Sequence, residues 1–259
     1  MNQQLVVQLQ KAIIQRMRCK WILVLFSTLL CSSAFAQEEE RGQYDQVAQT
    51  VEKKILDQKK VQVDNLTVRH EAGTVYLEGV AKLYGSRYKA GEAAAEVKGI
   101  EKVENMIAVT AGEVSDSEIE ATLMAKIRQH LRPEPFDLLS VKVRSGSVLL
   151  SGVVVDTTLK EDALEETIWT KGVRYVENQI QLASIAAGDQ RLRRLIYTRL
   201  SREFPRYFVG RYPSIIIVVE NARVTLVGSV GSLAEKEKIS SMIRSLPGVL
   251  SVNNLLESS

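Results

Sequence analysis

The residues best suited to binding chemistry are arginines and aromatics gathered between residues 189 and 212. This stretch holds seven arginines against two carboxylates, Asp189 and Glu203. Guanidinium groups bind phosphates and carboxylates, and aromatic rings partition to membrane–water interfaces. The pattern therefore favours contact with an anionic surface. The candidate binding residues in this stretch are Arg191, Arg194, Arg202, Arg206, Tyr207, Phe208, Arg211 and Tyr212.

Two interpretations of this basic stretch stay open. On a helical wheel whose apolar stripe faces inward, Arg191, Arg194 and Arg202 fall together on the outer face, as a docking helix would place them. A charged outer face is also commonly just solvated, and Phe204 and Phe208 are equally suited to completing a core. The first interpretation predicts a site for lipid or an acidic partner, and the second predicts none.

Catalysis and metal binding find no support. Both cysteines, Cys19 and Cys31, lie in the first 36 residues, and the two histidines, His70 and His130, lie far apart without metal-ligand spacing. No glycine-rich phosphate loop and no G-x-S-x-G motif is present. We therefore expect no catalytic residues, no metal and no cofactor. The absence of a GXXG-type loop also argues against nucleic acid as a partner.

A frame of two glycines and an asparagine occurs three times in the sequence. The glycines are twenty residues apart in each copy, and the asparagine follows six residues later. Successive copies are offset by 73 and 76 residues, which indicates three tandem units. The three sets are Gly79, Gly99 and Asn105, then Gly152, Gly172 and Asn178, then Gly228, Gly248 and Asn254.

Each unit has the same order of expected elements. Apolar residues at every fourth position predict an opening helix, alternation about a short loop predicts a hairpin, and a second helix and a last strand follow. Asp156 and Ser232 are expected N-caps of that second helix. The predicted fold is α+β: three tandem α-β-β-α-β units, each with two helices packed on one face of a three-stranded mixed sheet.

The repeated residues themselves favour structural roles. The first glycine of each pair, such as Gly152, is expected to end a strand where the chain turns into the helix, and the second, such as Gly172, to end that helix in a left-handed conformation. The asparagines, such as Asn178, are expected to tie down backbone groups at the end of the sheet. Ligand contact is the alternative for both residue types.

The third unit departs from the others on the sheet face that points away from the helices. Ile216 and Val218 stand where the second unit has Ser140 and Lys142. An apolar outer face must be covered, and packing against another unit of the chain is the favoured interpretation because the linkers between units are short. Another subunit, a lipid or a partner strand is the alternative. Ile216 and Val218 therefore join the candidate residues for lipid or partner binding.

The first 36 residues predict a secretory signal peptide, with basic residues, an apolar run over 21–30 and small residues before a cleavage site after Ala36. Lipidation at Cys31 and an uncleaved anchor are the alternatives. Residues 1–36 hold four of the 34 basic side chains and none of the 31 acidic ones, so a nearly balanced 30 basic and 31 acidic side chains remain. Binding by charge must therefore come from local patches.

The V-x-L-x-G strand, the glycine twenty residues on and the following V-x-N resemble the BON domain of bacterial envelope proteins. The resemblance covers 44–110, 115–183 and 188–257, with Asn253 replacing the glutamate of the other copies in the third. It implies a periplasmic or outer-membrane-associated protein without enzymatic activity that attaches to phospholipid, and the basic stretch of the third unit makes an anionic membrane surface the expected partner. The rival expectation is an envelope protein-interaction or chaperone-like module that binds partner or client chains through the third sheet. The oligomeric state stays open.

Overall fold

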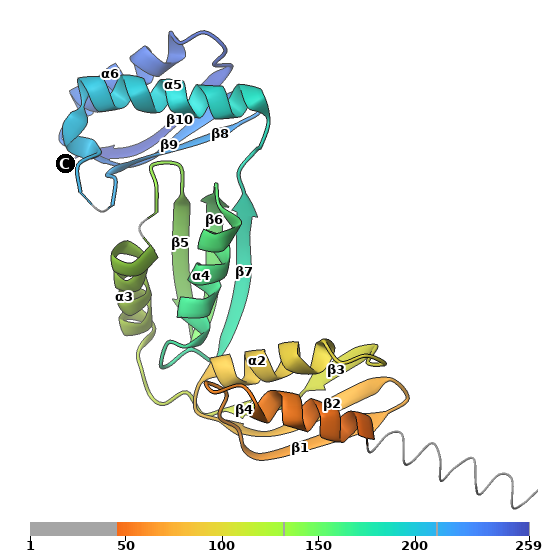
Figure 1. The fold of residues 1–259 in the computed structure, drawn as a ribbon. Coiled ribbons are helices and arrows are strands. Elements are labelled where there is room, and N and C mark those ends of the chain that lie inside the picture. The colour runs from red at the N-terminus through yellow and green to blue at the C-terminus, as the bar shows by residue number, and fades with distance from the viewer. Residues whose placement is uncertain (1–45, 132, 211, 259) are drawn as a thin grey trace, which may run out of the picture. The chain divides into compact units, whose positions relative to one another are not determined.

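The computed structural model describes residues 46–131, 133–210 and 212–258. Contacts between residues divide the chain into two compact units. Among the described residues, the first comprises 46–59, 66–78 and 91–106, and the second comprises 60–65, 79–90 and those from 107 onward. The predicted signal peptide, with its cleavage site and Cys31, lies outside the described residues. The division runs through the first repeat, so the second unit holds part of that repeat and the whole of the other two (Figure 1).

The second repeat follows the predicted order closely. Helix α3 (Asp116–Lys126) is followed by strands β5 (Leu138–Arg144) and β6 (Ser147–Val154), helix α4 (Thr157–Ile168) and strand β7 (Tyr175–Leu182). In the sheet, β6 lies between β5, its antiparallel partner, and β7, its parallel partner. Helix α3 packs against β5, helix α4 packs against β6 and β7, and the two helices close one core over the sheet. This is the predicted α-β-β-α-β unit with a mixed sheet.

The third repeat has the same architecture. Helix α5 (Ala187–Glu203), the short helix η2 (Pro205–Tyr207), strands β8 (Ile215–Glu220) and β9 (Arg223–Val230), helix α6 (Leu233–Arg244) and strand β10 (Ser251–Ser258) occur in that order. The sheet order is β10-β9-β8, and α5 and α6 cover one of its faces (Figure 1). The opposite face of this sheet is the one on which the sequence places Ile216 and Val218.

The first repeat differs in its last strand. A helix over residues 46–56 precedes β1 (Asp64–Glu71), β2 (Thr74–Ala81) and α2 (Tyr84–Ala95). Two short strands, β3 (Lys102–Asn105) and β4 (Ala108–Val109), then pair with β2 in parallel. The other repeats have one continuous strand here, so the repeat frame survives a local break that the sequence pattern did not reveal.

Buried side chains occupy the positions that the periodicity predicts. In the second repeat Ile119, Leu123 and Ile127 are buried with the inward residues of the strands, and Leu192, Ile196 and Leu200 repeat this arrangement in the third. The opening helix of the second repeat ends in a π-helical turn, η1 (Ile127–Leu131), and Pro133, which cannot continue a helix, follows shortly after it.

The glycines have the structural character predicted for them, at a slightly different place. Gly152 has φ of 131° and lies within β6, opposite Leu139. The sequence predicted that the strand ends at this glycine, but β6 continues to Val154. A Cβ at this position would lie 1.9 Å from the Leu138 carbonyl oxygen. Close approach of the partner strand, combined with positive φ, therefore requires glycine. Gly172 has the expected positive φ, 90°, but α4 already ends at Ile168 with Trp169 as its C-cap, so the prediction that this glycine ends the helix is wrong and Gly172 instead lies in the turn that follows it.

The polar caps also match the prediction. The Asn178 side chain accepts the Ile180 backbone N–H at 3.1 Å, and the Asn254 side chain accepts that of Leu256 at the same distance. Asp156 caps α4 by accepting the Thr158 N–H. Backbone fixing, the favoured interpretation of the asparagines, is thus confirmed for the second and third repeats.

Candidate functional site

The candidate site is built on α5. Its apolar stripe, Leu192, Ile196 and Leu200, is buried against the third sheet, which fixes the rotation of the helix. With the stripe inward, Arg191, Arg194 and Arg202 are exposed to solvent. The three guanidinium groups therefore point away from the core, as the helical wheel predicts.

These three arginines form no ion pair within the part of the chain that the structure describes. Leu195 lies in the same helix between Arg194 and Arg202 and is 38% exposed. We call these four residues, Arg191, Arg194, Leu195 and Arg202, the α5 surface. It combines uncompensated positive charge with an exposed apolar side chain, the combination that an interfacial helix needs. Sequence reasoning missed Leu195 because it lies just outside the buried stripe.

The opening helix of the second repeat presents the opposite charge. Its first turn carries Asp116 and Glu118, and Glu120 follows on its exposed side. Positions equivalent to Arg191 and Arg194 are Glu118 and Ala121 there. The basic surface is thus a property of the third repeat and not of the fold.

Arg193, within the same basic stretch, is a structural residue. Its guanidinium donates to the carbonyl oxygens of Ser184 at 2.6 Å and Val219 at 3.3 Å, and only 7% of the residue is exposed. Burial lowers the pKa of Arg193, and the carboxylate of Asp189 opposes that shift. This arginine ties the connector before α5 to strand β8, so it is not available to a ligand.

Arg206 and Tyr207 are also engaged within the protein. The Tyr207 hydroxyl donates to Glu235 at 2.7 Å and accepts the Gly231 backbone N–H at 2.7 Å, and the ring is buried in the core. Arg206 forms an ion pair with Glu235 and lies over the Tyr207 ring. These bonds join the end of α5 to the start of α6. The Ser232 hydroxyl caps α6, while the Glu235 carboxylate is directed to Tyr207 and Arg206.

Phe208 belongs to an aromatic group with Tyr197 of α5, whereas the Tyr212 ring lies against Arg128. The Phe208 ring contacts Tyr197 edge-on at 5.4 Å, and Tyr197 contacts Phe136 of the second repeat in the same way at 5.8 Å. Arg128 lies 5.6 Å from the Tyr212 ring centre, and burial raises the pKa of the Tyr212 hydroxyl. Arg211 lies outside the described residues. The interpretation that Phe208 completes a core is the one its packing supports.

Ile216 is buried, with 5% of its surface exposed, and Val218 is half-buried. Across the outer face of the sheet, Ile216 pairs with Val227, and Val227 pairs with Leu255. Leu255 is 54% exposed. The apolar outer face predicted from the sequence is therefore present as a row of three residues, and its accessible end is Leu255.

Strand β8 is contacted along its free edge by the second repeat. The Ile217 backbone N–H donates to the Pro135 carbonyl oxygen at 2.7 Å, and the adjacent Phe136 packs against the core of the third repeat. Within residues 46–258, the connector of the second repeat therefore occupies part of the edge that a partner strand would use.

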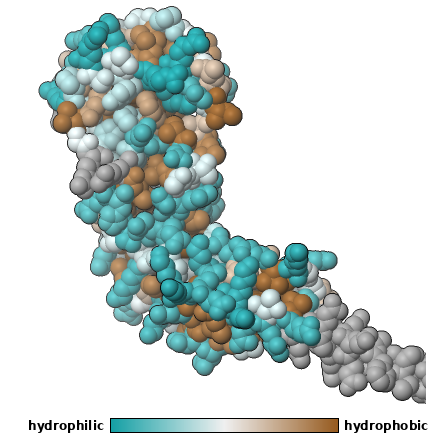
Figure 2. All heavy atoms as spheres, in the orientation of Figure 1, coloured by the Kyte–Doolittle hydropathy of each residue, from teal (hydrophilic) through white to brown (hydrophobic). Residues whose placement is uncertain are grey.

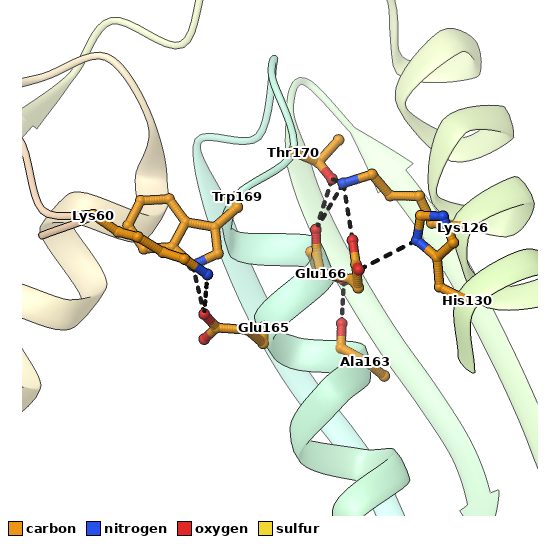
Figure 3. Close-up of polar contacts among 9 residues, drawn as sticks. Lys60, Lys126, His130, Ala163, Glu165, Glu166, Trp169 and Thr170 are labelled. Carbon is orange, nitrogen blue, oxygen red and sulfur yellow. Dashed lines mark hydrogen bonds and ion pairs between the residues drawn. The ribbon is translucent and has the colours of Figure 1, made fainter.

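Groups suited to catalysis or metal binding do not gather among the described residues. No cluster of three histidine, cysteine, aspartate or glutamate side chains occurs there. His130 approaches Glu166 at 3.4 Å, and Lys126 forms an ion pair with the same carboxylate at 3.1 Å (Figure 3). This cluster joins the end of α3 to α4. No described helix is both long and apolar enough to cross a bilayer.

The visible surface carries no broad apolar face. In the view of Figure 2, hydrophobic residues appear in small groups among hydrophilic ones. A broad apolar surface would indicate a membrane-inserted or obligate interface.

The repeats define the chain as a tandem array of small α+β binding modules, and comparison with known families assigns them. The sequence matches the family described as BON domain over residues 44–111, 115–184 and 188–258, so the chain belongs to this family. BON domains are associated with the bacterial envelope and with phospholipid binding, generally as modules without catalytic activity. The resemblance drawn from the sequence is thus confirmed.

Other comparisons add structural neighbours only. No curated protein matches the chain. Two solved structures of CdsD, a structural protein of the type III secretion system of Chlamydia trachomatis, are similar to it. One shows the C-terminal domain, is 11% identical with a TM-score of 0.24, and covers 80% of this chain and 94% of its own. The other is 10% identical with the same TM-score and covers 82% and 92%.

Proposed function

We propose that this chain is a non-enzymatic binding protein of the bacterial envelope that attaches to anionic phospholipid membranes through the α5 surface. The observation that carries the proposal is the exposure of Arg191, Arg194 and Arg202, without carboxylate partners among the described residues, around the accessible Leu195. Family membership supports the same ligand class. The leader predicted from the sequence would deliver the chain to the periplasm, where such membranes are available.

Electrostatics gives the expected strength. Each basic side chain close to an anionic membrane contributes about 1 kcal/mol. Three such side chains therefore contribute about 3 kcal/mol, which corresponds to roughly 100-fold in the membrane partition coefficient. Leu195 adds apolar contact at the level of the headgroups, as interfacial helices do. Attachment of this strength is reversible and depends on salt.

Vesicle co-sedimentation tests the proposal. The chain from residue 37 onward is mixed with vesicles of phosphatidylcholine alone or with phosphatidylglycerol added. We expect binding only to the anionic vesicles, and a loss of at least about 100-fold when Arg191, Arg194 and Arg202 are all changed to Glu, because the attraction is lost and repulsion is added. Equal binding to both vesicle types, or no binding to either, would refute it.

A matched control distinguishes the effect of the α5 surface on vesicle binding from the effect of net charge. Lys142, Arg144 and Arg223 are exposed cations on strands β5 and β9. Changing these three to Glu alters the net charge by the same amount but leaves α5 intact. Binding should survive in this control. An equal loss in both triple variants would mean that attachment follows net charge alone and that α5 has no special place in it.

The second candidate function is the binding of a partner or client chain on the outer face of the third sheet. The observation that favours it is the row from Ile216 through Val227 to the exposed Leu255. Site-specific crosslinking from position 255 in an envelope extract tests this function. Capture that is lost with Val227→Lys, while vesicle binding is unchanged, would favour it over lipid attachment.

A further inference from the structure

A cavity of about 460 Å³ in the second compact unit has a cationic lining. Three lysines from different segments border it: Lys60 follows the first helix, Lys82 follows β2, and Lys171 follows α4. None of the lining residues is a carboxylate, and the remaining ones are Gln62, Leu83, Ser86, Thr110, Ala111 and Gly112. Convergent positive charge without acidic residues favours an anionic ligand.

The lysines are largely free to serve such a ligand. Lys82 and Lys171 have no ion-pair partner in the part of the chain that the structure describes. Lys60 lies 3.7 Å from Glu165, whose carboxylate also accepts the Trp169 indole N–H at 2.8 Å (Figure 3). The same carboxylate approaches Lys89 at 3.3 Å. One carboxylate shared in this way leaves the charge of the lining lysines uncompensated.

A buried hydroxyl supplies the second observation. Ser86 lines the cavity, and only 2% of its surface is exposed. Its oxygen accepts the Gln62 backbone N–H at 3.0 Å, but its own O–H has no acceptor among the described residues. A buried hydroxyl normally satisfies both its donor and its acceptor capacity. An anion in the cavity would accept the unused hydrogen bond.

The second repeat does not share this chemistry. Residues 73 positions downstream of Lys60, Gln62, Lys82 and Ser86 are Pro133, Pro135, Val155 and Leu159, none of which has a charged or polar side chain. The common fold therefore does not require cations at these positions. The lysine-rich lining of the cavity is specific to the end of the first repeat and its contact with the second.

We infer that the cavity bordered by Lys60, Lys82 and Lys171 is a binding site for a phosphate-class oxyanion. Ammonium groups contact phosphate as compact point charges, and the Ser86 hydroxyl adds a directed donor. The phosphate is either free or the headgroup of a lipid, and both present the same oxygens. This site is separate from the α5 surface, so it stands or falls independently of membrane attachment through the third repeat.

Trp169 provides a reporter for the site. Residues 37–259 contain a single tryptophan, Trp169, and Lys60 lies 6.0 Å from its ring centre. An anion that draws Lys60 toward the cavity changes the charge beside the indole, and the emission of that ring responds. The chain from residue 37 onward is titrated, at constant ionic strength, with inorganic phosphate and separately with dihexanoyl phosphatidate below its micelle concentration.

We expect a saturable change in Trp169 emission with one or both probes. The apparent Kd should rise about tenfold or more in the Lys82→Glu, Lys171→Glu double variant, because charge-assisted bonds are replaced by repulsion. Ser86→Ala should weaken binding in the same direction. The Lys142→Glu, Arg144→Glu double variant, on the outer strand β5, should bind as the unchanged chain does.

The two probes identify the source of the phosphate. A lysine-dependent response to inorganic phosphate supports a free-phosphate site, and such a response to phosphatidate alone supports a lipid headgroup site. No saturable response to either probe would overturn the inference, and so would a response that is equal in the unchanged chain and the cavity variant. Changing Arg191, Arg194 and Arg202 to Glu should leave both titrations unaltered, which keeps this result distinct from the vesicle assay.

Discussion

The carboxylate of Asp189, in the first turn of α5, accepts the backbone N–H of Ala222 at the tip of the β8–β9 hairpin across 2.9 Å. Its second oxygen accepts the Asn221 N–H at the same distance. Both turn residues have positive φ, which directs their N–H groups to one side. In the second repeat Asp116 holds Ser145 and Gly146 identically, at 2.7 and 2.8 Å. The opening helix and the hairpin are thus joined by one side chain in both the second and the third repeat.

This clamp predicts a stability loss. Asp189→Ala should lower the free energy of unfolding by about 1–3 kcal/mol, because it leaves two backbone N–H groups without acceptors and removes a negative charge that favours the charged form of buried Arg193. Asp116→Ala should also destabilise. Asp162→Ala, at an exposed position of α4, is the control and should change little. Urea denaturation measures all three. Equal stability of the Asp189 and Asp162 variants would contradict the clamp.

A pH dependence follows from Glu166. Burial acts to raise the pKa of this carboxyl, but hydrogen bonding and the charge of Lys126, with His130, outweigh burial and lower it. A depressed folded-state pKa contributes stability that is present above the ordinary carboxyl pKa near 4.3 and is lost as pH falls through the folded value. Glu166→Gln should therefore be less stable than the unchanged chain at pH 7, and the difference should shrink below about pH 4.

Thermal unfolding across that range provides the measurement. Glu161→Gln, an exposed carboxylate on the same helix, serves as the matched control and should show no such convergence. A difference between Glu166→Gln and the unchanged chain that stays constant from pH 7 to pH 3 would rule out the ion pair as its cause.

Glycine substitutions distinguish close approach from ordinary helix positions. A Cβ at Gly228 would lie 2.0 Å from the Ser214 carbonyl oxygen, so Gly228→Ala should destabilise the third repeat by several kcal/mol, on the order of a disrupted core. A Cβ at Gly188, in α5, meets nothing within 4 Å. Gly188→Ala should stabilise by about 0.5–1 kcal/mol. Calorimetry on both variants checks the opposite signs.

Substitution of Tyr207 tests whether this residue of the basic stretch has a structural role or binds a ligand. Tyr207→Phe removes the hydroxyl that serves Glu235 and Gly231, which should cost about 1–3 kcal/mol of stability. Binding to anionic vesicles at a temperature where the variant is folded should remain unchanged, because 8% of the residue is exposed. A loss of binding by the folded variant would return Tyr207 to the membrane-contacting set.

Local patterns predicted most of the fold. The apolar spacing of Leu192, Ile196 and Leu200 sets the rotation of α5, and paired glycines with turn residues set the hairpins, because these signals depend on neighbours a few positions away. Contacts between distant segments could not be foreseen. Arg193 reaches Val219, and Tyr207 reaches Glu235, only once the helices lie on the sheet.

The same limit applies to the candidate site. The helical wheel correctly predicted that Arg191, Arg194 and Arg202 lie on the solvent-exposed face of α5, since the rotation of the helix alone decides their exposure. Ile216 was expected at an outer face, and its burial reflects packing that no strand pattern contains. The lysine-lined cavity gave no sequence signal because Lys60, Lys82 and Lys171 converge from segments up to 111 positions apart.

The bond from the Pro135 carbonyl to the Ile217 amide has a consequence for the order in which the chain is made. An unprotected strand edge invites pairing with neighbouring molecules. Because the second repeat precedes the third, its connector has already left the ribosome or the export channel when β8 emerges. Growth from the N-terminus thus supplies the cover before the vulnerable edge, which limits the time available for aggregation.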